Sequence, residues 1–231
     1  MNFDKLLERI QNRLCRLGMI KAATWDFALR QKEPMLYAGE IRSDLPQYKS
    51  HFGITPFVSS PRNIRHDLRN PFPIKNDSVS RFQSEDVFEH IPYADLPPVI
   101  EEIYRVLKPS SLFRLNLPDY RCPVMLDRSV KDSDGKPIFD PEGGGDFKDG
   151  KVVNGGHVWF PTLEIIKPLL EQSSFGRRGR ISYLHFTDAD GKSVLNPIDY
   201  SLGHIMRTPD HDDRARPGSH AMSIVVDAWK A

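Results

Sequence analysis

Apolar residues near the start of the chain recur at the spacing of one helix face. They are Phe3, Leu6, Leu7, Ile10, Leu14 and Leu17. Basic residues fill the positions between them, and Gly18 stands where such a helix would end. We expect an amphipathic helix whose basic face is solvated and does not bind a membrane. With a second short helix expected at residues 22–30, residues 1–32 form a helical N-terminal extension.

From Met35 the pattern changes to short apolar runs separated by turn residues, which is typical of buried strands in an α/β domain. The predicted strands span residues 35–38, 53–58, 63–66, 79–83 and 112–117. Between the last two, apolar residues from Leu96 to Leu107 form one helical stripe. Asp95 can cap this helix, and Pro97 and Pro98 fit its first turn. A strand, a helix of this length and another strand predict a right-handed crossover and a parallel strand pair.

The next segment, residues 120–160, is longer than a connection within a sheet requires. Glycines punctuate it, yet apolar residues are interleaved throughout, so we expect an ordered lid-like insertion over the carboxyl edge of the sheet, with a charged tip in solvent. A further helix is predicted at residues 162–172. Strands are predicted at residues 180–186 and 222–229, separated by a polar excursion.

Composition indicates one globular domain over residues 1–231, with 39% hydrophobic residues. The 32 basic and 31 acidic side chains leave a formal net charge of +1, so no chain-wide charge favours nucleic acid. Cys15 and Cys122 lack metal or redox spacing and are expected to be reduced thiols in a cytoplasmic protein. No stretch approaches the ~20 apolar residues that cross a bilayer, so no membrane partner is expected.

Four motifs at characteristic spacing carry a family resemblance: D-L-R-N-P-F-P from Asp67, E-H-I from Glu89, R-V-L-K-P from Arg105 and L-N-L-P-D from Leu115. Together they resemble the class I S-adenosylmethionine-dependent methyltransferases, most closely the small type 11 group. The resemblance covers about residues 35–119 well. It implies a doubly wound, mostly parallel seven-stranded sheet whose last strand is antiparallel, with the long insertion after strand five. The cofactor, S-adenosylmethionine, would bind at the carboxyl ends of the first strands.

The resemblance also implies a set of cofactor-binding positions: Ala38, Gly39, Thr55, Asp67, Leu68, Gln83, Ser84 and Glu85. Gly39 stands where a glycine-rich turn begins, Asp67 and Leu68 would contact the adenine, and Gln83 to Glu85 would lie beside the methionine moiety. The chain departs from the family at two of these positions. The first turn keeps only Gly39, and Thr55 stands near the usual acidic ribose ligand.

Three residues are candidates for catalysis. Asp119 matches the rim where the acceptor enters, Tyr120 follows it, and His157 lies in a glycine- and aromatic-rich turn. A general base at these positions would assist transfer to a hydroxyl or protonated amine. The alternatives are a turn-capping Asp119 and a structural His157. Glu89 and His90 are expected to anchor a loop.

No metal site is predicted. The densest group of ligand-type residues, at 210–213, is contiguous in sequence and so unsuited to converge on one ion. The leading hypothesis is a methyltransferase acting on a small-molecule or saccharide acceptor. The alternative is a non-catalytic binding or interaction protein of the same fold with a degenerate cofactor pocket. The oligomeric state is not predicted.

Overall fold

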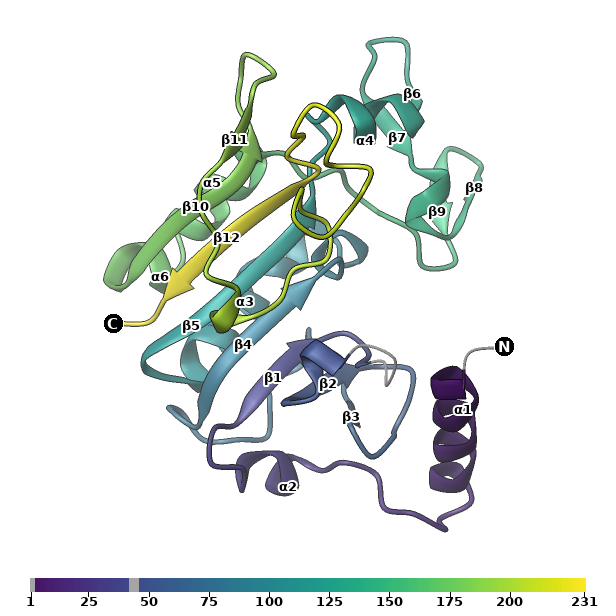
Figure 1. The fold of residues 1–231 in the computed structure, drawn as a ribbon, viewed down its shortest axis with the longest axis vertical. Coiled ribbons are helices and arrows are strands. Elements are labelled where there is room, and N and C mark those ends of the chain that lie inside the picture. The colour runs from purple at the N-terminus through teal and green to yellow at the C-terminus, as the bar shows by residue number, and fades with distance from the viewer. Residues whose placement is uncertain (1–2, 42–45) are drawn as a thin grey trace.

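The computed structural model describes residues 3–41 and 46–231, which form a layered α/β domain around one eight-stranded sheet (Figure 1). The order across the sheet is β11-β10-β12-β5-β4-β1-β2-β3. Strands β1 to β5 are parallel to one another, whereas β12 runs antiparallel to both β5 and β10. Two separate hairpins, β6-β7 and β8-β9, belong to the insertion after β5.

The strands are β1 (Met35–Ala38), β2 (His51–Thr55), β3 (Asn63–Arg65), β4 (Val79–Glu85), β5 (Leu107–Pro118), β6 (Val130–Lys131), β7 (Pro137–Phe139), β8 (Asp146–Lys148), β9 (Lys151–Val153), β10 (Arg180–Thr187), β11 (Ser193–Leu195) and β12 (Ser223–Trp229). The α-helices are α1 (Phe3–Arg16), α2 (Trp25–Leu29), α3 (Leu96–Val106), α4 (Pro123–Arg128), α5 (Leu163–Glu171) and α6 (Ser174–Arg178). The 3₁₀ turns are η1 (Pro46–Tyr48), η2 (Phe88–His90), η3 (Tyr93–Asp95), η4 (Pro141–Gly143) and η5 (Tyr200–Leu202).

The predicted fold class is confirmed, with two differences in detail. The seven expected sheet strands are present, and β11 adds an eighth by pairing antiparallel with β10. Asp95 precedes α3 as predicted, but its side chain makes no capping hydrogen bond, because the preceding 3₁₀ turn places its backbone in a helical conformation. Both cysteines are free thiols, as predicted, and Cys122 is buried.

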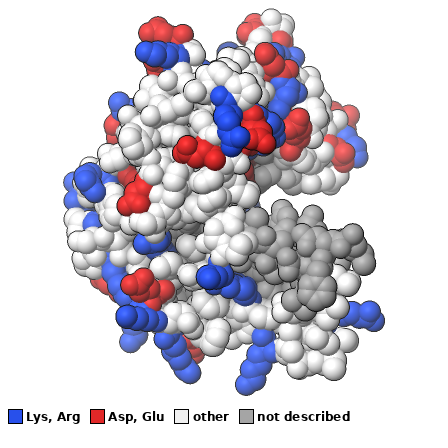
Figure 2. Space-filling view, in the orientation of Figure 1, with Lys and Arg blue, Asp and Glu red and all other residues white. Residues whose placement is uncertain are grey.

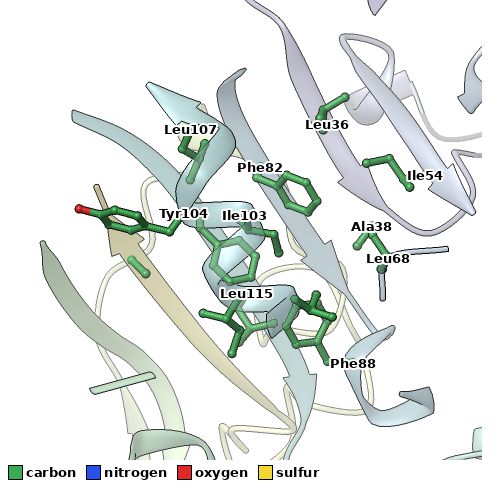
Figure 3. Close-up of a cluster of buried hydrophobic side chains, with 14 of the residues drawn as sticks. Leu36, Ala38, Ile54, Leu68, Phe82, Phe88, Ile103, Tyr104, Leu107 and Leu115 are labelled. Atoms are coloured by element: carbon green, nitrogen blue, oxygen red, sulfur yellow. The ribbon is translucent and has the colours of Figure 1, made fainter. Parts of the chain in front are cut away.

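One face of the sheet carries the main hydrophobic core. Side chains from β1 and β4, such as Leu36 and Phe82, pack with Leu115 of β5 and with Ile103 of α3 (Figure 3). These positions alternate along their strands, so successive inward residues meet the helices that follow. The apolar stripe of α3, which the sequence predicts, thus packs in one core with side chains of β4 and β5 and holds these two strands together.

The opposite face of the sheet is polar at its centre. Gln83, Arg114 and Asp227 lie at the same level on adjacent strands β4, β5 and β12. We call residues 196–222, which lead from β11 to β12, the C-terminal loop; Figure 1 shows this loop crossing in front of β5 and β4. Its backbone carbonyls accept hydrogen bonds from Gln83 and Arg114. The C-terminal loop therefore covers this face with backbone polar groups.

The connections on the β1–β3 side of the sheet are short. Residues 56–62 join β2 to β3 and residues 66–78 join β3 to β4, and neither segment contains an α-helix. The described part of the β1–β2 connection contains only η1. Parallel strands are usually joined through a helix. In this chain α2 and η1 pack on these strands: Phe27 of α2 contacts Phe52 of β2, and Tyr48 of η1 contacts Tyr37 of β1.

Charged side chains of both signs lie on the surface. Figure 2 shows Lys and Arg interspersed with Asp and Glu over the face drawn, in keeping with the net charge of +1. No helix in the described part of the chain is long and apolar enough to cross a membrane.

Candidate functional site

The turn after β1 begins at Gly39, as predicted. Its φ of +107° is in the region that favours glycine, and its N–H donates to the carbonyl of Ile54 at 2.9 Å. A β-carbon on Gly39 would lie 3.1 Å from Cγ2 of Val87, which follows β4. The turn is therefore packed directly against the β4 end of the sheet.

Asn63 of β3 holds the next part of this turn. Its Oδ1 accepts the N–H of Ile41 at 2.7 Å, and its Nδ2 donates to the Ile41 carbonyl at 3.2 Å. Between them lies Gly53 of β2, where a β-carbon would come within 2.6 Å of the Gly39 carbonyl oxygen. The turn after β1 thus passes close to the backbone of β2, and only glycine at position 53 leaves room for this approach.

Replacing Asn63 by alanine is expected to destabilise this crossing. The buried N–H and carbonyl of Ile41 would lose their partners, and the expected loss of unfolding free energy is about 1 to 3 kcal/mol. Urea denaturation of the variant and the parent measures it. Asn76→Ala is a suitable control, because the Asn76 side chain accepts from Arg105 at an exposed site. Equal stabilities for Asn63→Ala and the parent would contradict this role of Asn63 in holding the turn.

Aromatic rings occupy the space beside this turn. Tyr37, Ile41 and Tyr48 form a small buried cluster, with the two tyrosine rings 5.2 Å apart. The Tyr48 hydroxyl donates to Oε2 of Glu85 at 2.6 Å. Sequence analysis did not single out Tyr48, which joins the β1–β2 connection to the end of β4.

The ends of β2 and β3 carry three predicted cofactor residues. Thr55 is buried, and its hydroxyl accepts the N–H of Phe57 at 3.3 Å. Asp67 is partly exposed and pairs with Arg69 at 2.6 Å, and this hydrogen-bonded guanidinium lowers the pKa of the Asp67 carboxyl. Leu68 is buried in the main core. Of the three, Asp67 alone presents a charged group near the surface.

The end of β4 is engaged by the C-terminal loop. Gln83 donates to the carbonyl of His204 at 2.5 Å, and Oε1 of Glu85 accepts the N–H of Met206 at 2.7 Å. Burial, followed by the nearby Asp86 carboxylate, raises the pKa of Glu85 to about 7. Ser84 points away from this contact, and its buried hydroxyl has no partner.

Asp119, the predicted acceptor-side carboxylate, is fully buried at the end of β5. Its two oxygens accept the backbone N–H groups of Arg121 at 2.9 Å and Thr187 at 2.6 Å. Burial raises the pKa of Asp119 to about 6. Both carboxylate oxygens thus accept hydrogen bonds from backbone amides and link the ends of β5 and β10. This arrangement is close to the turn-capping alternative for Asp119.

Tyr120 and His157 are brought together by the insertion. The Tyr120 hydroxyl lies 2.5 Å from Nδ1 of His157 and donates to Oδ2 of Asp140 at 2.5 Å. Arg128 pairs with the same carboxylate. With Tyr120 donating to Asp140, His157 carries its proton on Nδ1 and leaves Nε2 as the free nitrogen. Burial, followed by the nearby His90 ring, lowers the pKa of His157 to about 3, so its ring is neutral at pH 7.

The free nitrogen of His157 faces the turn that follows β4. Its Nε2 lies 3.6 Å from Oε1 of Glu89, and the rings of His157 and His90 are 4.8 Å apart. Glu89 is fully buried. Sequence analysis treated Glu89 and His90 as a loop anchor. A Glu-His pair directly after a buried strand, at the sheet edge that carries sites in α/β folds, is the signal that could have identified them.

Comparisons with known proteins rest on structure, since no family model and no curated protein matches the sequence. A SAM-dependent methyltransferase from Thermotoga maritima, described as a possible histamine N-methyltransferase, is 13% identical, with 99% of this chain and 96% of that one covered and a TM-score of 0.50. The chain has the class I methyltransferase fold. Its strand order, with β12 antiparallel between β5 and β10, agrees with this. Methyltransferases from Methanosarcina mazei (12% identity, 91% and 99% covered, TM-score 0.48) and Archaeoglobus fulgidus (14%, 99% and 100%, 0.47) are also similar.

In this methyltransferase fold most of the predicted site residues fall into three groups. Ala38, Gly39, Asp67 and Leu68 lie at or just after the carboxyl ends of β1 and β3. Tyr120 and His157 meet beyond the ends of β4 and β5, next to Glu89. Thr55, Glu85 and Asp119 are occupied by hydrogen bonds within the protein.

Proposed function

We propose that the chain is an S-adenosylmethionine-dependent methyltransferase that acts on a small-molecule or saccharide acceptor. The observation that supports it is the buried cluster of Tyr120, His157 and Glu89 at the carboxyl edge of the sheet, beneath the insertion. The class I fold carries ligands at this edge. Within this cluster the Glu89 carboxyl is buried without a hydrogen bond, which costs free energy of folding.

The residues at the ends of β1 and β3 fit an adenosyl group. The left-handed turn at Gly39 lets backbone approach a ligand without a β-carbon, and the partly exposed Asp67 carboxylate can accept from an exocyclic amine. When bound, S-adenosylmethionine supplies an electrophilic methyl group on its sulfonium. For such a donor, alignment of the acceptor provides most of the rate enhancement.

The chain's own residues would move a proton from the acceptor. His157 is neutral with Nε2 free, so Nε2 can accept a hydrogen bond from the acceptor and would take its proton once bond formation to the methyl group has made that proton strongly acidic. The resulting imidazolium would be stabilised through Nδ1 by Tyr120, which donates to the Asp140 carboxylate. The insertion brings this chain of groups to the edge of the sheet and would exclude water from it.

A second candidate function, a non-catalytic binding or interaction protein, is favoured by a different observation. Val87 packs directly on Gly39, and Tyr48 and the C-terminal loop take both oxygens of Glu85. In this arrangement the polar groups at the end of β4 bind the protein itself. A protein that uses this fold only as an interaction surface would keep these polar groups bonded within the chain.

Calorimetric titration with S-adenosylmethionine and S-adenosylhomocysteine distinguishes the two candidates. Saturable binding of both supports the methyltransferase. If neither compound gives a heat of binding and neither changes the melting temperature, the result would support the non-catalytic protein and contradict our proposal.

Within that titration, Asp67→Ala is expected to weaken binding of S-adenosylhomocysteine by about 1 to 3 kcal/mol, through loss of a charge-assisted hydrogen bond. Asp127→Ala is the matched control, because Asp127 is 80% exposed on α4 and forms only a distant pair with Lys131. Equal affinities for Asp67→Ala and Asp127→Ala would place the adenine elsewhere.

A further inference from the structure

Two segments distant in sequence are fixed together just beyond β4. The N–H of Val158 donates to the carbonyl of Glu89 at 2.9 Å, and the Trp159 indole N–H donates to the carbonyls of Phe88 at 3.0 Å and Ile91 at 2.9 Å. These bonds hold the end of the insertion against η2. They set the positions of Glu89, His90 and His157 without using their side chains.

The three side chains converge on one point. One ligand atom from each of Glu89, His90 and His157 lies within 4.8 Å of the other two, and Nε2 of His157 is 3.6 Å from Oε1 of Glu89. A tetrahedral ion with ligands at about 2.0 to 2.2 Å needs its ligands roughly 3.4 Å apart. The Glu89–His157 spacing already fits, and the His90 ligand atom, within 4.8 Å of the other two, would complete the set by moving closer to them.

Three buried polar atoms of this cluster lack partners. Neither oxygen of Glu89 forms a hydrogen bond, although the side chain is fully buried, and Nδ1 of His90 is buried and also unpartnered. Buried polar groups are nearly always satisfied. The neighbouring cation Arg207 does not supply the partner, because its guanidinium bonds to Asp86 and Ser223.

The surroundings of His157 are those of a metal ligand. Its Nδ1–H donates to the Tyr120 hydroxyl, which donates to Asp140, and Arg128 pairs with Asp140. Metal-bound histidines usually donate their second ring nitrogen in this manner, which fixes the tautomer and aims the other nitrogen at the ion. Here the aimed atom is Nε2, which faces Glu89.

We propose that Glu89, His90 and His157 bind a divalent transition-metal ion of the zinc class. Two imidazoles and one carboxylate suit zinc, cobalt or iron(II), whereas calcium and magnesium prefer oxygen ligands alone. Three protein ligands leave a coordination position open for water or an acceptor oxygen. This role rests on the proposed methyltransferase function: the ion would bind the acceptor hydroxyl at the open position and lower its pKa, so that its proton passes to solvent water, and His157 would serve as a ligand in place of the base proposed for the metal-free protein.

Sequence analysis predicted no metal site, and it set residues 210–213 aside because they are contiguous in sequence. In the structure, Asp210 and Asp212 bond to Tyr200 and Arg214. The cluster that carries the present proposal instead joins a pair after β4 with a histidine from the far end of the insertion.

The test is a titration of the full-length protein with Zn²⁺, after treatment with a chelator and its removal, in the absence of S-adenosylmethionine. We expect one equivalent to bind, and Co²⁺ at the same site to show the visible absorption of a low-coordinate ion. Glu89→Gln and His157→Ala should each weaken Zn²⁺ binding by about 100-fold or more, because each removes a ligand. Tyr120→Phe, which removes only the support of His157, should weaken it by roughly 10- to 100-fold.

The control variant is His204→Ala. His204 and His211 are the other histidines with closely packed rings, 4.2 Å apart, in the C-terminal loop. Loss of binding in His204→Ala but not in Glu89→Gln would overturn the proposal, as would the absence of stoichiometric binding. Circular dichroism checks that each variant is folded, and Glu89→Gln is nearly isosteric. Because no S-adenosylmethionine is present, failure to bind the cofactor leaves the metal result interpretable, and the reverse also holds.

Discussion

Replacing Arg114 by methionine is expected to lower the free energy of unfolding by about 3 to 5 kcal/mol, the usual cost of removing one partner from a buried ion pair. Arg114 is fully buried, and its guanidinium forms two 2.8 Å hydrogen bonds with the Asp227 carboxylate. It also donates to the carbonyls of Asp199 and Gly203 in the C-terminal loop. Methionine fills a similar volume but leaves a buried carboxylate and two carbonyls without donors.

Urea denaturation at pH 7 measures this loss, with Arg216→Met as the matched control. Arg216 is 60% exposed and pairs with Asp213, which is 90% exposed, so its replacement should change stability by about 1 kcal/mol or less. The double variant Arg114→Met/Asp227→Leu is informative as well, since it removes both charges and should recover part of the loss. Similar stabilities for Arg114→Met and Arg216→Met would show that the C-terminal loop is not held by this pair.

The polar face of the sheet on which Arg114 lies could be predicted from the sequence only in part. The alternation of apolar and polar residues in β4, with Arg81 and Gln83 flanking Phe82, does indicate a strand with one polar face. It does not indicate what covers that face. The cover is the C-terminal loop, which contacts β4 through backbone carbonyls and the Met206 N–H, and backbone groups leave no trace in the side-chain pattern. The strands that feed the apolar core were predictable because each is an apolar run between turn residues.

The candidate site shows the same division. Tyr120 and His157 were identified from their positions after β5 and in an aromatic turn, and the insertion places them in contact. The environment of Asp119 was not predictable, because its partners are main-chain amides of Arg121 and Thr187, and any residue could supply those. Glu89 was assigned a structural role because the residues that meet it, His157 and Val158, are distant in sequence, and the pattern does not show which residues of the insertion face η2.

Replacing Glu85 by glutamine is expected to flatten the dependence of stability on pH. The folded-state pKa of Glu85 is about 7, raised from an ordinary value of 4.5 by burial and then by Asp86, and hydrogen bonds from Tyr48 and Met206 offset only part of this. Below pH 4.5 the carboxyl is protonated in both folded and unfolded chains. As pH rises to about 7, the unfolded chain releases this proton while the folded chain retains it, so the free energy of unfolding falls.

The size of the effect follows from the shift, at 1.36 kcal/mol for each pKa unit. Between pH 5 and pH 8 the parent should lose roughly 2 to 3 kcal/mol through Glu85, and Glu85→Gln should not. A glutamine can still accept the Met206 N–H and donate to the Tyr48 hydroxyl, so its packing is preserved. Urea denaturation at the two pH values measures the difference, with Glu171→Gln, 52% exposed on α5, as control. Parallel pH profiles for all three proteins would mean that Glu85 is already ionised in the folded chain.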